Sequence, residues 1–357
     1  ISRTMDSLLH CALYLLFITN IVHCNSVGVN VHQYASLPET EACPNAEDIS
    51  PCSCTNGQNG IELDCSQVED DDDLARVFSA PFPQNNVYKL TIQHNNHIRN
   101  LTDDIFGDIK FVEVHIKFCE LQYVGKYTFK ESDETLEKLD LQSNLLSDFP
   151  FDTLDDHVAL KSVVMNTNKF TFVPILNIPT LEYFALHTNP LTEVPEKPFV
   201  HLPYLETLYL SKAKLTSIPI DMFPIQFNLT LVDFSLNQLT TIDENTFLLV
   251  SDKMDWLYLM DNSISTIQPG AFAGMRDMLI ALERNNLVTL EEAVFGELLQ
   301  NNVILRLTSN PLVCMCDVAW IVRNPDVHHL VDTAHCAGGQ RLVDLDPSDF
   351  DDCPNEQ

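Results

Sequence analysis

Basic residues and glycines are scarce in this sequence. Lys and Arg total 20 against 51 Asp and Glu, which gives a formal net charge of −31. A nucleic-acid partner needs a basic protein surface, so this balance excludes nucleic acid, and it also disfavours docking on an anionic membrane. The 10 glycines form neither a GxGxxG motif nor a phosphate-binding loop. We therefore expect no nucleotide cofactor.

Motifs for hydrolytic and metal chemistry are also missing. The chain contains neither an HExxH helix signature nor a GxSxG nucleophile motif. The pair His328-His329 has no further ligand at a suitable spacing, so an ordinary surface position is the simpler interpretation. The acidic run from Glu69 to Asp73 lacks the spacing of a calcium loop and favours a solvated acidic turn. The sequence predicts no enzyme, no metal site and no cofactor.

One long apolar run occurs, close to the start of the chain. From Met5 the sequence reads MDSLLHCALYLLFITNIVHCNS, and it is apolar from Leu8 to Val22. This run is too short for a comfortable membrane span and lies where a secretory signal belongs, although no positive charge follows Met5. We expect a leader and signal peptide over residues 1–26, with cleavage after Cys24 or Ser26. No later run predicts a membrane span, so the sequence predicts a secreted, extracellular protein whose cysteines form disulfides.

Asparagine recurs at a steady spacing through most of the chain. The segments LDLQSNLL, LYLMDNSI and LRLTSNPL share the pattern LxLxxNx followed by Leu or Ile. The column defined by this pattern is Asn95, Cys119, Asn144, Asn168, Asn189, Ala213, Asn237, Asn262, Asn285 and Asn310. Successive members are 21 to 25 residues apart, which indicates about ten copies of one unit. The pattern is that of the leucine-rich repeat.

The repeat pattern predicts a stacked fold. Apolar residues three and five positions before each asparagine alternate, so they lie on one face of a short strand. No repeat buries its apolar face alone, and stacking on neighbours supplies the stability. The predicted fold class is an α/β solenoid: a leucine-rich-repeat horseshoe of about ten repeats. We expect a parallel concave sheet with irregular or short 3₁₀ segments outside it.

The asparagine column has a physical role of its own. A buried amide offers donors and an acceptor to backbone groups left unpaired where the chain leaves the strand. Cys119 is a small, weakly polar substitute in this column, and it is the odd cysteine among the nine that follow the signal segment. The alternative for Cys119 is a reactive or intermolecular thiol. Ala213 interrupts the column and predicts a locally weaker coil, bridged by water.

Two cysteine clusters flank the repeats. The first consists of Cys43, Cys52, Cys54 and Cys65, and the second of Cys314, Cys316, Cys336 and Cys353. Neither has the paired CxxC spacing of a zinc site. Four cysteines allow three pairings, and the spacing alone does not choose among them.

These clusters resemble the N-terminal and C-terminal cysteine-rich caps of extracellular leucine-rich-repeat proteins. In that family the first cysteine pairs with the third and the second with the fourth. The resemblance implies the disulfides Cys43–Cys54, Cys52–Cys65, Cys314–Cys336 and Cys316–Cys353. Trp320 matches the tryptophan in the first helix of the C-terminal cap. The implied domains are an N-terminal linker and cap over 27–86, repeats over 87–310, and a C-terminal cap and tail over 311–357.

A narrower resemblance concerns the first cluster. The segment ACPNAEDISPCSC, followed by IELDCSQVEDDDDLARVFSAPFP, is similar to a secreted crustacean group of leucine-rich-repeat proteins. That group includes the non-catalytic subunit of decapod shrimp luciferase. The resemblance implies a secreted accessory chain that binds and supports a small catalytic subunit.

The register set by the asparagines also predicts which side chains face solvent. Positions six, four and two before each asparagine point away from the core. The early coils present a polar, partly basic set: Lys89, Thr91, Gln93, Glu113, His115, Lys117, Lys138, Asp140 and Gln142. The later coils present an aromatic and apolar set: Tyr183, Tyr209, Leu231, Trp256, Tyr258, Met260, Leu279 and Ile304. Exposed anchors of the second kind mark protein interfaces, which predicts a partner-binding patch. The alternatives are that these residues pack on one another, or that a one-residue slip turns them inward.

Two sequons, Asn100-Leu-Thr102 and Asn228-Leu-Thr230, predict N-glycosylation of Asn100 and Asn228 outside the strand core of their repeats.

The leading functional hypothesis is a secreted, non-catalytic binding protein that acts through its concave face, as an accessory subunit for a secreted enzyme or another protein partner. One alternative is a stand-alone extracellular recognition protein of immunity or matrix that binds glycans or receptors. Another is a structural protein that self-associates, so homo-oligomers and hetero-oligomers both remain open.

Overall fold

The computed structural model describes residues 43–220, 222–248 and 251–354. The chain separates into a short unit over residues 1–40 and one large unit, Glu41–Gln357, and all described residues belong to the large unit. The predicted leader and signal peptide over residues 1–26, and most of the linker that follows it, lie outside the described residues.

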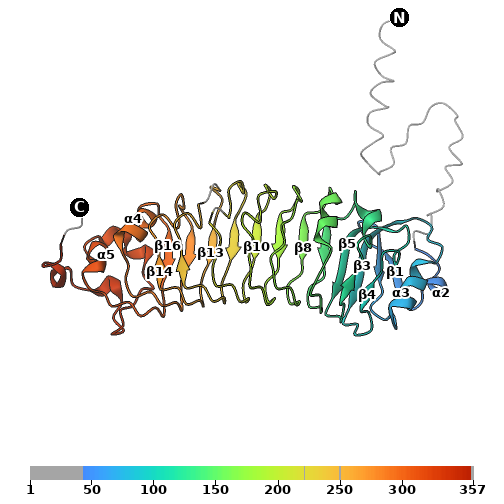
Figure 1. The fold of residues 1–357 in the computed structure, drawn as a ribbon, viewed down its shortest axis with the longest axis horizontal. Helices are drawn as coiled ribbons and strands as arrows, with labels where there is room; N and C mark the ends of the chain where they lie inside the picture. Colours follow the sequence, from blue (N-terminus) through green and yellow to red (C-terminus); the bar gives the residue numbers. More distant parts are fainter. Residues whose placement is uncertain (1–42, 221, 249–250, 355–357) are drawn as a thin grey trace, which may run out of the picture. The chain divides into compact units, whose positions relative to one another are not determined.

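A 12-stranded sheet extends through the large unit (Figure 1). The first two strands pair antiparallel, and each later strand pairs parallel with the strand before it in the sheet. In sheet order the strands are β1 (Ser53–Asn56), β2 (Ile61–Asp64), β3 (Asn86–Gln93), β5 (Lys110–Lys117), β7 (Lys138–Asp140), β8 (Ser162–Val164), β9 (Tyr183–Ala185), β10 (Thr207–Tyr209), β11 (Leu231–Asp233), β13 (Trp256–Tyr258), β15 (Leu279–Ala281) and β16 (Ile304–Arg306). The predicted sheet of stacked parallel strands is confirmed.

Alternation along each strand places one apolar side chain in the core. Leu208, Val232 and Leu257 occupy the middle of three successive strands, are register partners, and are fully buried. A second apolar layer lies further along each repeat, where Phe199, Phe223, Phe247 and Phe272 form a column. Successive rings in this column stack with centroids 5.9, 6.5 and 5.8 Å apart. Each repeat thus buries its apolar residues against the next repeat rather than within itself.

The asparagine column forms a ladder of hydrogen bonds. The Nδ2 atom of Asn168 donates to the carbonyl oxygens of Leu141 at 2.9 Å and Met165 at 3.1 Å. Its Oδ1 atom accepts from the amide of Leu146 at 3.1 Å. Asn144, Asn237, Asn262, Asn285 and Asn310 repeat this arrangement in their own coils. The ladder therefore pairs backbone groups that the turn after each strand leaves open.

The residue directly before each column position has left-handed backbone geometry. Its φ lies between 51° and 62° at His94, Phe118, Ser143, Thr167, Thr188, Lys212, Leu236, Asp261, Arg284 and Ser309. None of these residues is glycine, although left-handed geometry costs an L-residue roughly 1–2 kcal/mol. The hydrogen bonds of the ladder hold the chain in this turn and offset that cost. The LxLxxN pattern did not reveal this feature, because no residue type marks the position.

Short elements connect the strands outside the main sheet. The pairs β4 (Asn100–Leu101) with β6 (Tyr123–Val124) and β12 (Thr241–Ile242) with β14 (Thr266–Ile267) form two small parallel sheets. The 3₁₀ helices η1 (Lys130–Ser132) and η2 (Phe151–Asp156) match the predicted outer segments. One outer segment differs from the expectation, because α4 (Glu292–Gln300) is a regular helix. Phe295, Leu298 and Leu299 lie three and four residues apart, so one helical face is buried on the core.

The N-terminal cap contains α2 (Ala46–Ile49), the β1–β2 pair and α3 (Asp71–Phe78). Its disulfides join Cys43 to Cys54 and Cys52 to Cys65. The acidic run expected as a solvated turn instead begins a helix. The carboxylate of Asp70 accepts a hydrogen bond from the amide of Asp73 at 2.8 Å, and acidic residues in this first turn favour the helix dipole.

The C-terminal cap consists of short helices: η3 (Cys316–Val318), α5 (Ala319–Val322), η4 (Pro325–Leu330), η5 (Leu342–Asp344) and η6 (Pro347–Phe350). Its disulfides join Cys314 to Cys336 and Cys316 to Cys353. All four disulfides are the pairs that the resemblance to capped repeat proteins implies. The indole Nε1 of Trp320 in α5 donates to the carbonyl of Leu290 at 2.8 Å, which ties the cap to the last repeats.

Candidate partner-binding face

We call one surface of the main sheet the late strand face. It is formed by the outward-pointing residues of six strands and by the residue two places after each of them. These strands are β9, β10, β11, β13, β15 and β16. Parallel register aligns these residues in rows across the sheet. The first row is Tyr183, Thr207, Leu231, Trp256, Leu279 and Ile304. The second row is Ala185, Tyr209, Asp233, Tyr258, Ala281 and Arg306. All the predicted patch residues except Met260 lie in these two rows, and Met260 follows β13.

The aromatic residues of the late strand face lie outside the core. Trp256 is 42% exposed, and the other seven predicted patch residues are half-buried. The Trp256 and Tyr258 rings stack with centroids 6.1 Å apart and planes inclined by 10°. The Tyr183 and Tyr209 rings are 5.7 Å apart. Leu257 lies between Trp256 and Tyr258 in sequence and is fully buried, so the register has not slipped.

Three polar residues lie among these aromatics. Asp233 is in the second row, between Tyr209 and Tyr258, while His187 and Glu283 are each two positions before a column asparagine. Burial raises the pKa of both tyrosines, and the nearby Asp233 charge raises it further. Burial also lowers the pKa of His187, whose Nδ1 atom has no hydrogen-bond partner among the described residues. The predicted patch did not include Asp233, His187 and Glu283, although the register that located the aromatic residues also places these three on the late strand face.

The early strand face, formed by β3, β5 and β7, differs from the expected solvated, partly basic surface. The Nζ atom of Lys89 is 2.8 Å from Glu62. His115 Nε2 lies 2.9 Å from Glu113 Oε2 and its Nδ1 lies 3.4 Å from Asp140 Oδ2. Asp140 and His115 are buried, because neighbouring long side chains pair with one another across the strands and cover them. The basic charge of this surface is therefore largely neutralised within the protein.

Asp140 is the most buried charge on the early strand face. Burial raises its pKa, but the hydrogen bonds from His115 and from the amide of Gln142, with the charge of Lys117, outweigh burial and hold that pKa below its ordinary value. Burial also raises the pKa of Glu113, but the hydrogen bonds from His115 and Tyr88 outweigh burial and lower that pKa. These charges support the fold rather than present a binding site.

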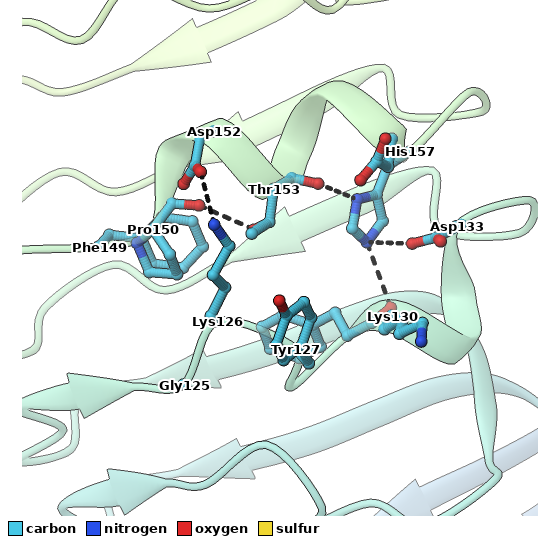
Figure 2. A pocket seen from close by; sticks show the side chains of 12 residues that line it. Gly125, Lys126, Tyr127, Lys130, Asp133, Phe149, Pro150, Asp152, Thr153 and His157 are labelled. Carbon is cyan, nitrogen blue, oxygen red and sulfur yellow. Dashed lines mark hydrogen bonds and ion pairs between the residues drawn. The ribbon is translucent and has the colours of Figure 1, made fainter.

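A pocket of about 170 Å³ lies among the outer loops, next to η1 and η2 (Figure 2). His157 is buried beside it, with Nδ1 3.1 Å from the Thr153 carbonyl oxygen and Nε2 3.7 Å from Asp133 Oδ1. Figure 2 also shows Lys126 reaching Asp152, at 2.9 Å. These polar groups pair with one another across neighbouring repeats, so the pocket is part of the stacking of the coils.

An adjoining groove is larger, and most of the residues that line it are apolar. It encloses about 800 Å³ and is lined by residues that include Phe151, Phe172 and Ile175. Phe172 is 38% exposed and Ile175 58%. The groove lies on connecting segments, away from the late strand face, and so provides a second apolar surface against which binding can be compared.

The remaining sequence candidates have simple surroundings. Cys119 is buried, its Sγ lies 3.2 Å from the Lys117 carbonyl oxygen, and burial raises the pKa of its thiol, which gives a reactive thiol no support. Asn100 is exposed and Asn228 half-buried, and glycosylation of both stays a prediction. In the described ranges, no group of three or more His, Cys, Asp or Glu side chains could hold a metal ion. This includes the surroundings of His328. None of the helices there has the length and apolar character that a membrane crossing requires.

Comparisons with known proteins decide the family. A profile of the BspA-type leucine-rich-repeat region matches residues 77–171 and 176–279 in six copies. The Oplophorus-luciferin 2-monooxygenase non-catalytic subunit of Oplophorus gracilirostris is 32% identical over 346 residues, which are 95% of this chain and 96% of that protein. The chain belongs to the leucine-rich-repeat family. The count of about ten repeats stays a prediction, since the profile matches six copies.

Other leucine-rich-repeat proteins match over shorter lengths. Mouse podocan is 26% identical over 72% of this chain and 36% of its own length, and mouse keratocan is 28% identical over 54% of each. A chain in the octameric complex of Latrophilin 3, Unc5D and FLRT2 has a TM-score of 0.63 at 20% identity, covering 75% of this chain and 83% of that one. A chain in the TLR13–ssRNA13 complex has a TM-score of 0.56 at 22% identity, covering 68% and 34%. The solved structures establish the leucine-rich-repeat fold.

These findings confirm the two resemblances drawn from the cysteine clusters and the first cap. This leucine-rich-repeat protein is related over nearly its whole length to a non-catalytic subunit, and it is not an enzyme itself. Its disulfides are of the kind that oxidising compartments allow to persist.

Proposed function

We propose that this leucine-rich-repeat protein is a secreted, non-catalytic accessory subunit that binds and stabilises a protein partner, a smaller catalytic chain of a secreted enzyme. The observation that carries the proposal is the 32% identity to a non-catalytic subunit over 95% of the chain. The relationship extends over nearly the whole of both chains, so it concerns the whole architecture rather than one repeat. The predicted signal peptide and the four disulfides support secretion.

The late strand face is the surface that we assign to the partner. Its aromatic side chains are held in fixed positions by the strands, so little conformational entropy is lost when a partner covers them. Trp and Tyr are the residues that most often dominate the energy of protein interfaces. Trp256 and Tyr258 already stack on each other, and Leu231, Leu279 and Ile304 extend the apolar area along the neighbouring strands. Glycans at Asn100 and Asn228 would leave these rows accessible, because neither asparagine belongs to them.

A double variant tests this assignment. Trp256→Ala with Tyr258→Ala removes the two stacked rings, and we expect a loss of partner binding of at least about a hundredfold, since central interface aromatics contribute roughly 2 kcal/mol or more each. The measurement is co-purification of the partner with the tagged protein from its own secretion or from cells that secrete both chains. The matched control is Phe172→Ala with Ile175→Ala, which truncates the apolar groove on the connecting segments.

The outcomes separate the candidate functions. Loss of the partner with the first variant but not with the control supports the late strand face. Retention of the partner by the first variant contradicts this assignment, and loss in the control would place binding in the groove. A monomer that carries no second chain would instead favour the stand-alone recognition protein, and a homodimer would favour self-association.

A further inference from the structure

The late strand face carries negative charge that the chain itself does not neutralise. Asp233 accepts a hydrogen bond from the amide of Ser235 at 2.8 Å, and Glu283 is half-buried with an Oε2 atom that is inaccessible to solvent and has no hydrogen-bond partner. In the part of the chain that the structure describes, neither carboxylate takes part in a salt bridge. By contrast, the carboxylates Glu113 and Asp140 of the early strand face lie beside His115 and Lys117. The two halves of the sheet therefore differ in how their acids are satisfied.

Aromatic rings stand beside these two carboxylates. Tyr258 is the register partner of Asp233 on one side, and on the other it faces Ala281, two residues before Glu283. Burial raises the pKa of Tyr258, and the charges of Asp233 and Glu283 both raise it further, so the phenol lies within the field of both acids. The stacked ring of Trp256 adds a flat surface that is 42% exposed.

The charge of Asp233 reaches His187, but burial lowers the pKa of that imidazole, and no described Lys or Arg of the late strand face forms an ion pair with Asp233 or Glu283. Arg306 is the one basic residue in the two rows of the late strand face, and its Nη1 atom lies 3.5 Å from Asp332 Oδ1 in the adjoining cap. Lys212 follows β10 on the turn, where it is exposed. A half-buried carboxylate without a partner costs free energy in the isolated chain, and an incoming cation recovers it.

We propose that Asp233, Glu283, Trp256 and Tyr258 form a recognition site for an arginine side chain of the protein partner. This inference rests on the proposed function and names the chemistry by which the partner is bound. A guanidinium group suits the site better than an ammonium group. Its planar face stacks on aromatic rings, and its N–H groups form charge-assisted hydrogen bonds to carboxylates. The net charge of −31 steers such a cationic partner toward the protein.

The test uses a small probe and does not require the natural partner. The probe is the peptide acetyl-Gly-Arg-Gly-Arg-Gly-amide, and the comparison is the same peptide with citrulline in place of arginine, which keeps the shape and removes the charge. Binding is followed by tryptophan fluorescence at low salt. The chain has two tryptophans, and Trp256→Phe assigns the signal because Trp320 is bonded to the Leu290 carbonyl in the cap.

Charge-removing variants locate the site. Asp233→Asn with Glu283→Gln keeps the side-chain volume, and we expect it to weaken binding of the arginine peptide by about tenfold or more, since the charge-assisted hydrogen bonds to both carboxylates are lost. The control, Glu297→Gln with Asp326→Asn, removes the same charge from exposed positions outside the sheet and should change binding by less than about twofold. We expect the citrulline peptide not to bind, and added salt to weaken arginine-peptide binding.

Equal binding of the two peptides, or equal weakening by the two double variants, would overturn the arginine site. The proposed function fails separately. A natural partner that binds the Asp233→Asn, Glu283→Gln variant normally but is lost from the Trp256→Ala, Tyr258→Ala variant would remove the arginine site and keep the accessory subunit. If the chain binds the arginine peptide specifically but co-purifies with no partner, the arginine site stands and the accessory subunit fails.

Discussion

Asn237 provides a direct measure of what the amide ladder contributes. Its side chain is buried, its Nδ2 atom donates to the carbonyls of Leu210 at 2.9 Å and Phe234 at 3.0 Å, and its Oδ1 atom accepts from the amide of Leu215 at 3.1 Å. Asn237→Ala deletes these three hydrogen bonds and a longer one to the Ser235 carbonyl at 3.3 Å, and it leaves the Leu215 N–H buried without an acceptor. One unsatisfied buried donor costs about 1–3 kcal/mol and each further lost bond about 0.5–1.5 kcal/mol. We expect a loss of about 3 kcal/mol in the free energy of unfolding.

Ala213 allows the same argument to be tested with the opposite sign. In regular coils one carbonyl accepts from two successive column asparagines, as Met165 does from Asn168 and Asn189. Ala213 has no side-chain amide to donate to the carbonyls of Leu186 and Leu210, so each of these carbonyls accepts from only one column asparagine. Ala213→Asn restores these bonds, and we expect it to stabilise the protein by about 1 kcal/mol.

Urea unfolding followed by circular dichroism measures both changes, with disulfides kept intact. The control is Asn286→Ala, which removes an exposed asparagine next to the column and should cost under about 0.5 kcal/mol. If Asn237→Ala costs no more than this control, the buried hydrogen bonds of the column do not stabilise the protein. Destabilisation by Ala213→Asn would likewise mean that the column does not act by hydrogen bonding.

Three further predictions concern single features of the fold. The pKa of Asp140 is lowered in the folded protein, so its contribution to stability is present above its unfolded pKa of about 3.9 and is lost as the pH falls through its lower folded pKa. Asp140→Asn should therefore lower stability at neutral pH and flatten its fall below about pH 4, as measured by denaturation at several pH values. Cys119 should stay unlabelled by iodoacetamide in the native protein and become labelled on unfolding, as mass spectrometry of its peptide will show; rapid native labelling would contradict its burial. Replacing both Cys316 and Cys353 by Ser removes one cap disulfide and should cost about 2–4 kcal/mol; an unchanged midpoint of thermal unfolding would contradict a stabilising cap.

The scaffold was predictable because its determinants are local and repeated. The asparagine column fixes the register of the main-sheet strands from β3 to β16, and it placed Trp256 and Tyr258 on the outer side of the sheet with Leu257 in the core. The cysteine pairing followed from the resemblance, not from spacing. The helix α4 was not predicted, since a single apolar helical face of nine residues is difficult to distinguish from an irregular outer segment.

The surface was harder to predict than the scaffold. Register gives the direction of a side chain but not its neighbours. Asp140 and His115 were therefore expected in solvent, yet both are buried, with Asp140 in cross-strand contact with His115 and Lys117. Asp233 and Glu283 were not among the predicted patch residues, because that patch was defined by aromatic and apolar side chains alone. Their lack of an ion-pair partner depends on which long side chains reach them, and a repeat pattern holds no information on this.

Native mass determination shows whether the chain acts as an accessory subunit through its late strand face. The protein is purified from its own secretion, weighed intact, and then separated into chains under denaturing conditions. We expect a stoichiometric complex with a second, smaller chain, which the Trp256→Ala, Tyr258→Ala variant fails to retain. A lone glycosylated chain, or a complex that survives this substitution unchanged, would mean that the late strand face does not hold an accessory partner.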